Sequence, residues 1–109
     1  MIPKSIKPRL SMTVSSKFKQ IDINQMIIDG NLVEINFRGL LNEAITNNEI
    51  ILSDLPRPFS DKVVLIGISS NQYRLDTIKW GYVDGSGRIR GEGFESRKWM
   101  HISWSYIKA

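Results

Sequence analysis

The chain has 109 residues, of which 41% are hydrophobic and 24% are charged, and its net charge is +4. These values are ordinary for one globular domain with its own core, and the length leaves little room for a second domain. Cysteine is absent and there is a single histidine, which excludes a disulfide framework, a thiolate metal site and a histidine cluster. We therefore expect no metal and no other cofactor.

The positive charge is concentrated near the N-terminus. Residues 1–20 contain no Asp or Glu, and they hold five of the 15 cations: Lys4, Lys7, Arg9, Lys17 and Lys19. The remaining ten cations face 11 anions, so the rest of the chain is close to neutral. We interpret residues 1–20 as a basic arm or linker and residues 21–109 as the folded domain. A basic arm can contact phosphate, but a nearly neutral body does not favour nucleic acid as the partner.

No segment is typical of a membrane span or a signal peptide. The longest apolar run, residues 63–68, is far shorter than the roughly 20 residues that a spanning helix needs. Residues 1–10 carry cations without an apolar segment behind them. We expect a soluble chain with no membrane partner.

The first predicted strands form a hairpin. Residues 25–28 are a short apolar strand, and Asp29-Gly30-Asn31 after them is a tight-turn signature. In residues 32–37 the apolar side chains alternate with polar ones, which predicts a strand with one buried face.

The middle of the chain predicts two further strands and a break between them. Residues 49–52, which are apolar after Glu49, follow a polar turn at Asn47-Asn48, and the two prolines in residues 54–59 prevent regular structure there. Residues 63–68 form a continuous, mostly β-branched run that is typical of a strand buried on both faces. Residues 40–47 have a helical pattern that is too short to predict a helix.

The last third predicts a hairpin and a long closing strand. Residues 78–83 and 88–90 flank the glycine-rich turn Asp84-Gly85-Ser86-Gly87, and residues 99–107 form an aromatic strand. Many short strands separated by turn signals predict an all-β fold: an antiparallel β-sandwich or barrel, jelly-roll-like, with about eight strands in one domain.

Four segments in this order, "DGNLVEINFRG", "LSDLPRPF", "VDGSGRIRGEG" and "WMHISWSYI", carry a resemblance over about residues 25–107. The series resembles the small β-domains that end the tail fibres and baseplate receptor-binding proteins of phages infecting Gram-positive bacteria. It is more loosely similar to the head domains of lactococcal phage receptor-binding proteins, which are trimers that bind host-wall saccharides. One departure lies in Leu55-Pro56-Arg57-Pro58-Phe59, where the second proline precedes the aromatic residue instead of following it.

The resemblance implies a host-adhesion role in the virion, at a tail tip, fibre or baseplate. It also implies a homotrimer whose partners are a host cell-wall glycan and other tail or baseplate proteins. In the lactococcal heads the strand before the Ser-Gly turn offers His and Asp to the sugar, whereas this chain has Trp80 and Tyr82 there. The fold and general role are therefore expected to carry over, but not the residues of that site.

The strongest candidate site flanks the turn. If Val83 and Ile89 face the core, alternation turns Trp80, Tyr82, Arg88 and Arg90 outward. Two aromatic rings beside two guanidinium groups suit a saccharide or phosphopolysaccharide, because a ring covers the apolar side of a sugar and Arg binds phosphate or hydroxyl oxygens. The alternative is that Trp80 and Tyr82 pack in the core or against another subunit.

The closing strand offers a second set of candidates. Met100, Ile102, Trp104 and Tyr106 form its more apolar face and are expected in the core, with the Tyr106 hydroxyl bonded near its edge. The opposite face begins with Trp99 and His101, which follow Arg97 and Lys98 and extend the candidate saccharide site. Alternatively, His101 is an ordinary surface or interface residue and the two cations only solubilise a loop.

No catalytic motif is present. Glu92 and Glu95 resemble the acid pair of a glycoside hydrolase, but in a glycine-rich loop two acids usually serve solvation. Nucleophile elbow, phosphate loop and zinc motif are all absent, so we expect a non-enzymatic protein. Three hypotheses remain: a saccharide-binding adhesion module, a structural trimerisation or attachment module of a tail fibre, and an OB-type binder of single-stranded nucleic acid.

Overall fold

The strands of the described residues all belong to one antiparallel sheet. The computed structural model describes residues 9–60 and 62–109, and within them it contains nine strands and no helix. The strands are β1 Arg9–Leu10, β2 Thr13–Val14, β3 Phe18–Asp29, β4 Leu32–Leu41, β5 Glu49–Ser53, β6 Lys62–Ser69, β7 Thr77–Val83, β8 Ile89–Gly91 and β9 Trp99–Ile107. Their spatial order is β1-β3-β4-β9-β6-β7-β8-β5-β2. The predicted all-β antiparallel class is confirmed.

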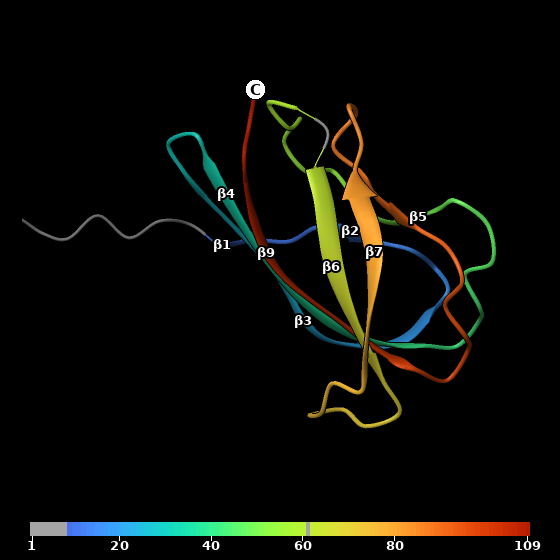
Figure 1. Ribbon diagram of the computed structural model, residues 1–109. Helices are drawn as coiled ribbons and strands as arrows, with labels where there is room; N and C mark the ends of the chain where they lie inside the picture. Colours follow the sequence, from blue (N-terminus) through green and yellow to red (C-terminus); the bar gives the residue numbers. More distant parts are fainter. Residues whose placement is uncertain (1–8, 61) are drawn as a thin grey trace, which may run out of the picture.

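The sheet curls into a half-barrel with two wings. Strands β3, β4 and β9 form one wing and strands β6, β7, β8 and β5 form the other. The wings are joined where β9 pairs with β6, and this pairing covers only Gly67–Ser69 and Trp99–His101. Beyond it the strands diverge, as Figure 1 shows for β9 and β6. The apolar core lies on the inner side of the curl.

The hairpin of β3 and β4 is longer than the sequence predicts. The strands pair from Phe18–Leu41 to Asp29–Leu32, with a two-residue turn in which Gly30 has a φ of 59°. The register shifts twice, between Phe18 and Gln20 and between Ile21 and Ile23. Such bulges bend a strand and increase its twist, which helps the sheet to curl.

The two outermost strands are consecutive in the chain. β1 pairs with β3 at one edge of the sheet and β2 pairs with β5 at the other, and only Ser11 and Met12 separate them. Met12 is buried, and its backbone N–H and C=O both bond to the Asn24 side chain, each at 2.8 Å. We call residues 9–14 the N-terminal clasp.

The clasp changes the interpretation of the basic arm. Residues 9–10, 13–14 and 18–20 lie in the sheet as β1, β2 and the start of β3, so part of the predicted arm belongs to the folded domain. Residues 1–8, with Lys4 and Lys7, lie outside the described residues.

The core is built from the inward positions of alternating strands. Fully buried side chains come from both wings and include Val33, Phe37, Ile66, Ile89 and Ile102. On β9 the predicted inward face is confirmed: Met100, Ile102 and Tyr106 are buried, and Trp104 packs against them in part. The Tyr106 hydroxyl donates to the Pro56 carbonyl at 2.6 Å, as expected of a buried tyrosine.

The prediction that the strand at residues 63–68 is buried on both faces is wrong for its first half. In the second half of β6 the consecutive residues from Ile66 to Ser69 are all buried. Val64 is buried, but Val63 is 52% exposed, and nothing among the described residues forms a second layer over it. An apolar outer face is therefore left uncovered on this wing.

Candidate binding face around the turn of β7 and β8

The turn between β7 and β8 orients the candidate residues. Val83 and Ile89 are register partners on either side of it, and both are fully buried. Their inward orientation was predicted from the alternation and is confirmed. Trp80 and Tyr82 on β7, and Arg90 on β8, consequently point to the outer face.

Asp84 holds the turn in shape. Its Oδ1 atom accepts hydrogen bonds from the backbone N–H groups of Ser86 and Arg88, at 2.9 and 3.1 Å. Gly87 has a φ of 74°, and a Cβ at this position would collide with the carbonyl oxygen of Leu55. The Leu55 N–H donates to the Gly87 carbonyl at 3.0 Å, so the turn and the proline-containing loop fix each other.

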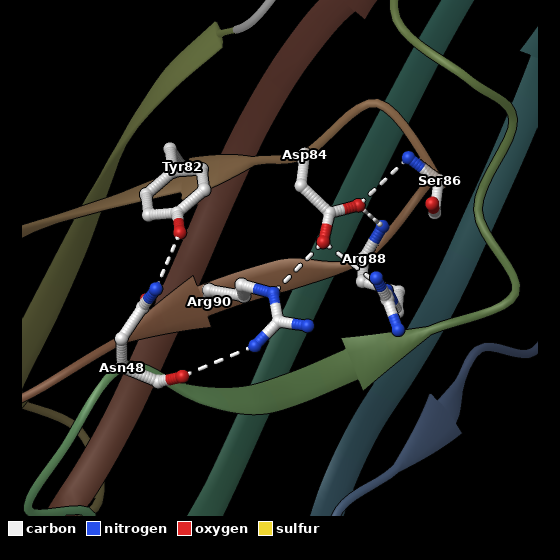
Figure 2. A network of polar contacts seen from close by, with 6 residues as sticks. All are labelled: Asn48, Tyr82, Asp84, Ser86, Arg88 and Arg90. Carbon is white, nitrogen blue, oxygen red and sulfur yellow. Dashed lines mark hydrogen bonds and ion pairs between the residues drawn. The ribbon is translucent and has the colours of Figure 1, made fainter.

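The second carboxylate oxygen of Asp84 binds both arginines (Figure 2). Oδ2 accepts from Arg88 Nε at 3.1 Å and from Arg90 Nε at 2.8 Å, and Arg90 Nη1 donates to the Asn48 carbonyl at 3.1 Å. Burial by itself would raise the pKa of Asp84, but the hydrogen bonds from Arg90, Ser86 and Arg88 outweigh it, and the pKa is lowered. Asp84 is therefore ionised at neutral pH.

This ion pairing bears on the predicted anion-binding role of the two arginines. Asp84 offsets one of the two guanidinium charges, so the three side chains carry a net charge of about +1. Both Nε atoms are already occupied by Asp84. Arg88 and Arg90 thus stabilise the turn, and their binding of an external anion stays a prediction.

Tyr82 is anchored and half-buried. It is the cross-strand partner of Arg90, and its hydroxyl accepts a hydrogen bond from Asn48 Nδ2 at 2.7 Å, as Figure 2 shows. The hydrogen bond from Asn48 therefore fixes the outer end of the ring.

Trp80 is the most exposed tryptophan among the described residues, at 70%, and it lies opposite Leu65 of β6. The ring borders a mainly apolar hollow of about 350 Å³. The residues that line this hollow are Asn48, Val63, Trp80, Gly81, Tyr82, Gly91 and Glu92. We call it the Trp80 hollow. Its volume lies within the range of small-ligand sites, and it combines two aromatic rings with an amide and a carboxylate.

The structure does not bring Trp99 and His101 to this hollow. Trp99 is 8% exposed and pairs with Ser69, and His101 is half-buried opposite Gly67. The Leu75 side chain lies so close to Gly67 that a Cβ there would collide with it, which places Leu75, from the loop of residues 70–76, over the register partner of His101. The six predicted site residues therefore separate into a group of four and a group of two.

His101 is partly buried and lies near one cation, Arg38, which itself pairs with Asp22. Burial and the nearby guanidinium of Arg38 lower its pKa, while a hydrogen bond with the Asn71 backbone acts in the opposite direction. Arg38 also stacks on the Tyr73 ring, 5.0 Å from its centroid. His101 is thus neutral at physiological pH and contacts the loop of residues 70–76.

The remaining candidates of the closing strand and the acid pair lie apart. Lys98 Nζ donates to Ser70 Oγ at 2.7 Å, and Arg97 occupies a positive-φ position before β9. Glu92 borders the Trp80 hollow, whereas Glu95 borders another depression, of about 160 Å³, beside Lys79 and Lys98. The two acids do not line a common hollow.

The sequence does not reveal two residues that line the hollow, Asn48 and Val63, nor the role of Asp84 outside the hollow as the partner of both arginines. It predicts Asn48 only as a turn residue, Val63 as a core residue, and Asp84 as part of a glycine-rich turn. The Asp84 contribution had a signal, because an Asp that begins a turn and is followed by two cations at spacings of four and six residues can bind both. Asn48 had none, since it comes from a distant loop.

No group of three or more His, Asp or Glu residues suited to a metal ion occurs in residues 9–60 and 62–109. The same part of the chain has no helix with the length and apolarity of a membrane span. No protein-family model, curated protein or solved structure matches the chain.

Proposed function

We propose that the chain is a non-enzymatic adhesion module that binds a cell-surface saccharide in the Trp80 hollow. The observation that carries this proposal is the indole of Trp80, 70% exposed at the border of a 350 Å³ apolar hollow with polar groups beside it. An exposed ring next to a mostly apolar depression with a few polar groups is the usual composition of a small-ligand site.

Each lining residue has a role in this proposal. Trp80 supplies the stacking surface, and covering about 100 Å² of apolar area would contribute about 2.5 kcal/mol. Tyr82 forms a second, fixed wall because Asn48 holds its hydroxyl. Glu92 accepts hydrogen bonds from sugar hydroxyls, and the second amide hydrogen of Asn48 donates one.

The arginines determine whether a phosphopolysaccharide is preferred to a neutral glycan. Arg88 and Arg90 keep a net charge of about +1 after pairing with Asp84, and Arg90 is next to Tyr82 across the strands. A phosphate bound here would compete with Asp84 for the guanidinium groups, so we expect only a modest gain from it.

The resemblance described above extends the proposal to a biological setting. A module of this kind would act in a phage virion, at the tail tip, fibre or baseplate, as a homotrimer attached to other tail or baseplate proteins. Its partner outside the virion would be a host cell-wall glycan.

The test is binding to a glycan array and to isolated Gram-positive cell walls, by the parent chain and by Trp80→Ala and Arg90→Ala. The matched control is Phe59→Ala, which removes an aromatic ring that is 78% exposed but does not line the Trp80 hollow. We expect Trp80→Ala to lose binding and Phe59→Ala to keep it. Absence of binding by the parent at high concentration would contradict the proposal. Binding that is lost as salt rises, without dependence on glycan, would indicate a nucleic-acid binder instead.

A second candidate is a structural trimerisation or attachment module. It is favoured by the exposed apolar side chains on adjacent strands of the same wing, with Val63 at 52% and Ile78 at 58% exposure beside Trp80. Exposed apolar patches commonly mark interfaces between proteins. In this case Trp80→Ala would split the oligomer in sedimentation equilibrium, while the saccharide proposal predicts an unchanged mass.

A further inference from the structure

A second and larger hollow lies on the outer face of the opposite wing, over β3, β4 and β9. Its volume is about 490 Å³. Ile35 and Trp104 border it between two rows of outward side chains, and those outward side chains are Gln25, Ile27, Glu34, Asn36, Ser103 and Ser105. We call it the polar groove. It shares no lining residue with the Trp80 hollow, which belongs to the other wing.

The groove is organised by the register of the three strands. Gln25 pairs with Asn36, which pairs with Ser103, and these form one row across the sheet. A second row contains Ile27, Glu34 and Ser105. Direct cross-strand partners share a face, with strands about 4.8 Å apart and alternate residues about 7 Å apart along each strand. Six side chains therefore form a regular grid of two rows.

Side-chain size explains why this face is hollow. Both positions on β9 are serines, whereas β3 and β4 carry longer side chains. The residues between the rows turn to the other side: Ile35 is buried in the core and Trp104 packs against it. The two serines and the backbone thus form a floor, with the longer side chains of β3 and β4 beside it.

The polar groups of the groove are not used inside the fold. Neither an ion pair nor a hydrogen bond joins the side chains of Gln25, Glu34, Asn36, Ser103 and Ser105 to any other described residue. The neighbouring Asn24 shows the contrast, because both ends of its amide bond to the Met12 backbone. Two amides, two hydroxyls and one carboxylate are therefore available to an external ligand.

We propose that the polar groove binds a neutral, hydroxyl-rich chain, an oligosaccharide. Hydroxyl groups donate and accept, and so do the amide and serine groups of the groove. No cation is among the described residues that line the groove, and Arg9, the cross-strand partner of Ile27 at its edge, offsets the charge of Glu34, so this face is close to neutral and suits an uncharged ligand. Ile27 offers the apolar contact for a sugar C–H face. This site does not depend on the function proposed for the Trp80 hollow.

The experiment compares four proteins on an array of neutral glycans that includes maltotriose and chitotriose: the parent, Asn36→Ala, Trp80→Ala and Asn42→Ala. Asn42 is the matched control, because it is an exposed asparagine that lines neither hollow. Asn36→Ala should weaken at least one glycan signal roughly tenfold, the effect of losing one or two hydrogen bonds to a ligand. Trp80→Ala and Asn42→Ala should keep that signal.

Two outcomes would overturn this inference. One is a parent that binds no neutral glycan on the array. The other is a set of glycan signals that Trp80→Ala removes and Asn36→Ala leaves intact, which would assign all binding to the Trp80 hollow. Unfolding curves test whether Asn36→Ala is still folded when its binding is weaker. They should match those of the parent because Asn36 is exposed.

Discussion

Arg90 donates from Nε to Oδ2 of Asp84 at 2.8 Å. The other oxygen of the same carboxylate accepts a hydrogen bond from the Ser86 N–H inside the turn. Asp84→Asn removes the charge and replaces one acceptor oxygen by an NH₂ donor, so either the two arginine bonds or the two backbone bonds lose their acceptor while the size is unchanged. Because both arginines are partly exposed, we expect a loss of about 1 to 2 kcal/mol in the free energy of unfolding. Urea denaturation checks this. An unchanged midpoint would mean that the arginines are held by their own packing.

The same carboxylate should make stability depend on acid. The pKa of Asp84 is lowered in the folded state from its ordinary value of 3.8, so the ionised carboxylate is more favourable in the folded than in the unfolded chain. Its contribution is present above pH 3.8 and is lost as the pH falls through the lower folded pKa. Denaturation curves at about pH 5 and about pH 2.5 check this, because these values lie above and below the ordinary pKa of the carboxyl group. Between them the parent should lose more stability than Asp84→Asn.

His101 should add a second pH dependence, at higher pH. Burial and Arg38 lower its pKa from 6.5, which means that the unfolded chain binds the proton more readily. Stability is then fully present above about pH 6.5 and falls as the pH drops through the folded pKa. His101→Gln should flatten the profile between about pH 7 and pH 5 in thermal unfolding. A slope that persists in this variant would assign the effect to another group.

The Tyr106 hydroxyl should matter more than that of Tyr82. Tyr106 is buried and donates to the Pro56 carbonyl at 2.6 Å, and burial raises its pKa strongly, so it remains a donor. Tyr106→Phe leaves that carbonyl without its donor and should cost about 1 kcal/mol in the free energy of unfolding. Tyr82→Phe, whose bond to Asn48 is solvent-exposed, is the matched control and should cost less. Equal losses would contradict the difference in burial.

Removal of the Trp80 ring and removal of the Arg88 guanidinium should affect saccharide binding differently as the salt concentration changes. If a saccharide binds in the Trp80 hollow, Trp80→Ala should weaken binding at every salt concentration, because apolar burial is not screened. Arg88→Ala should weaken it mainly at low salt, since an exposed charge is screened over about 10 Å at 0.1 M. Binding titrations at low and high salt separate the two effects, with Arg57→Ala as an exposed cationic control. The reverse pattern would contradict the assigned roles.

Trp80→Ala should also leave the fold intact. An outward side chain that is 70% exposed contributes little to the core, so we expect a change within about 0.5 kcal/mol in the free energy of unfolding. A large fall in the melting temperature would make Trp80 structural and would move the candidate site away from it.

Local pattern predicted those parts of the fold that local sequence determines. The alternation that turns Val83 and Ile89 inward and the turn at Gly30 were both readable, because each depends on neighbours in the chain. The exposure of Val63 could not be predicted, because an apolar run does not reveal whether a second layer covers it. Trp99 is buried even though it shares the outward face of β9 with exposed serines.

The candidate site shows the same limit. Trp80 and Tyr82 were predicted from alternation, but Asn48 reaches Tyr82 from 34 residues away in the sequence. Such a contact depends on how β5 and β8 pair, which is decided by the whole sheet. Likewise the polar groove exists only because three strands have a common register, and no single segment of the sequence carries that information.

In the N-terminal clasp, one short segment supplies the outermost strand at both edges of the sheet. If residues 9–14 detach, unpaired backbone groups of β3 and β5 become available together, and each could pair with a strand of another molecule. The most direct replacement is the clasp of a second copy, which would restore every lost contact and join two chains by exchange. The same six residues that keep one molecule closed are therefore also the segment through which copies could become linked.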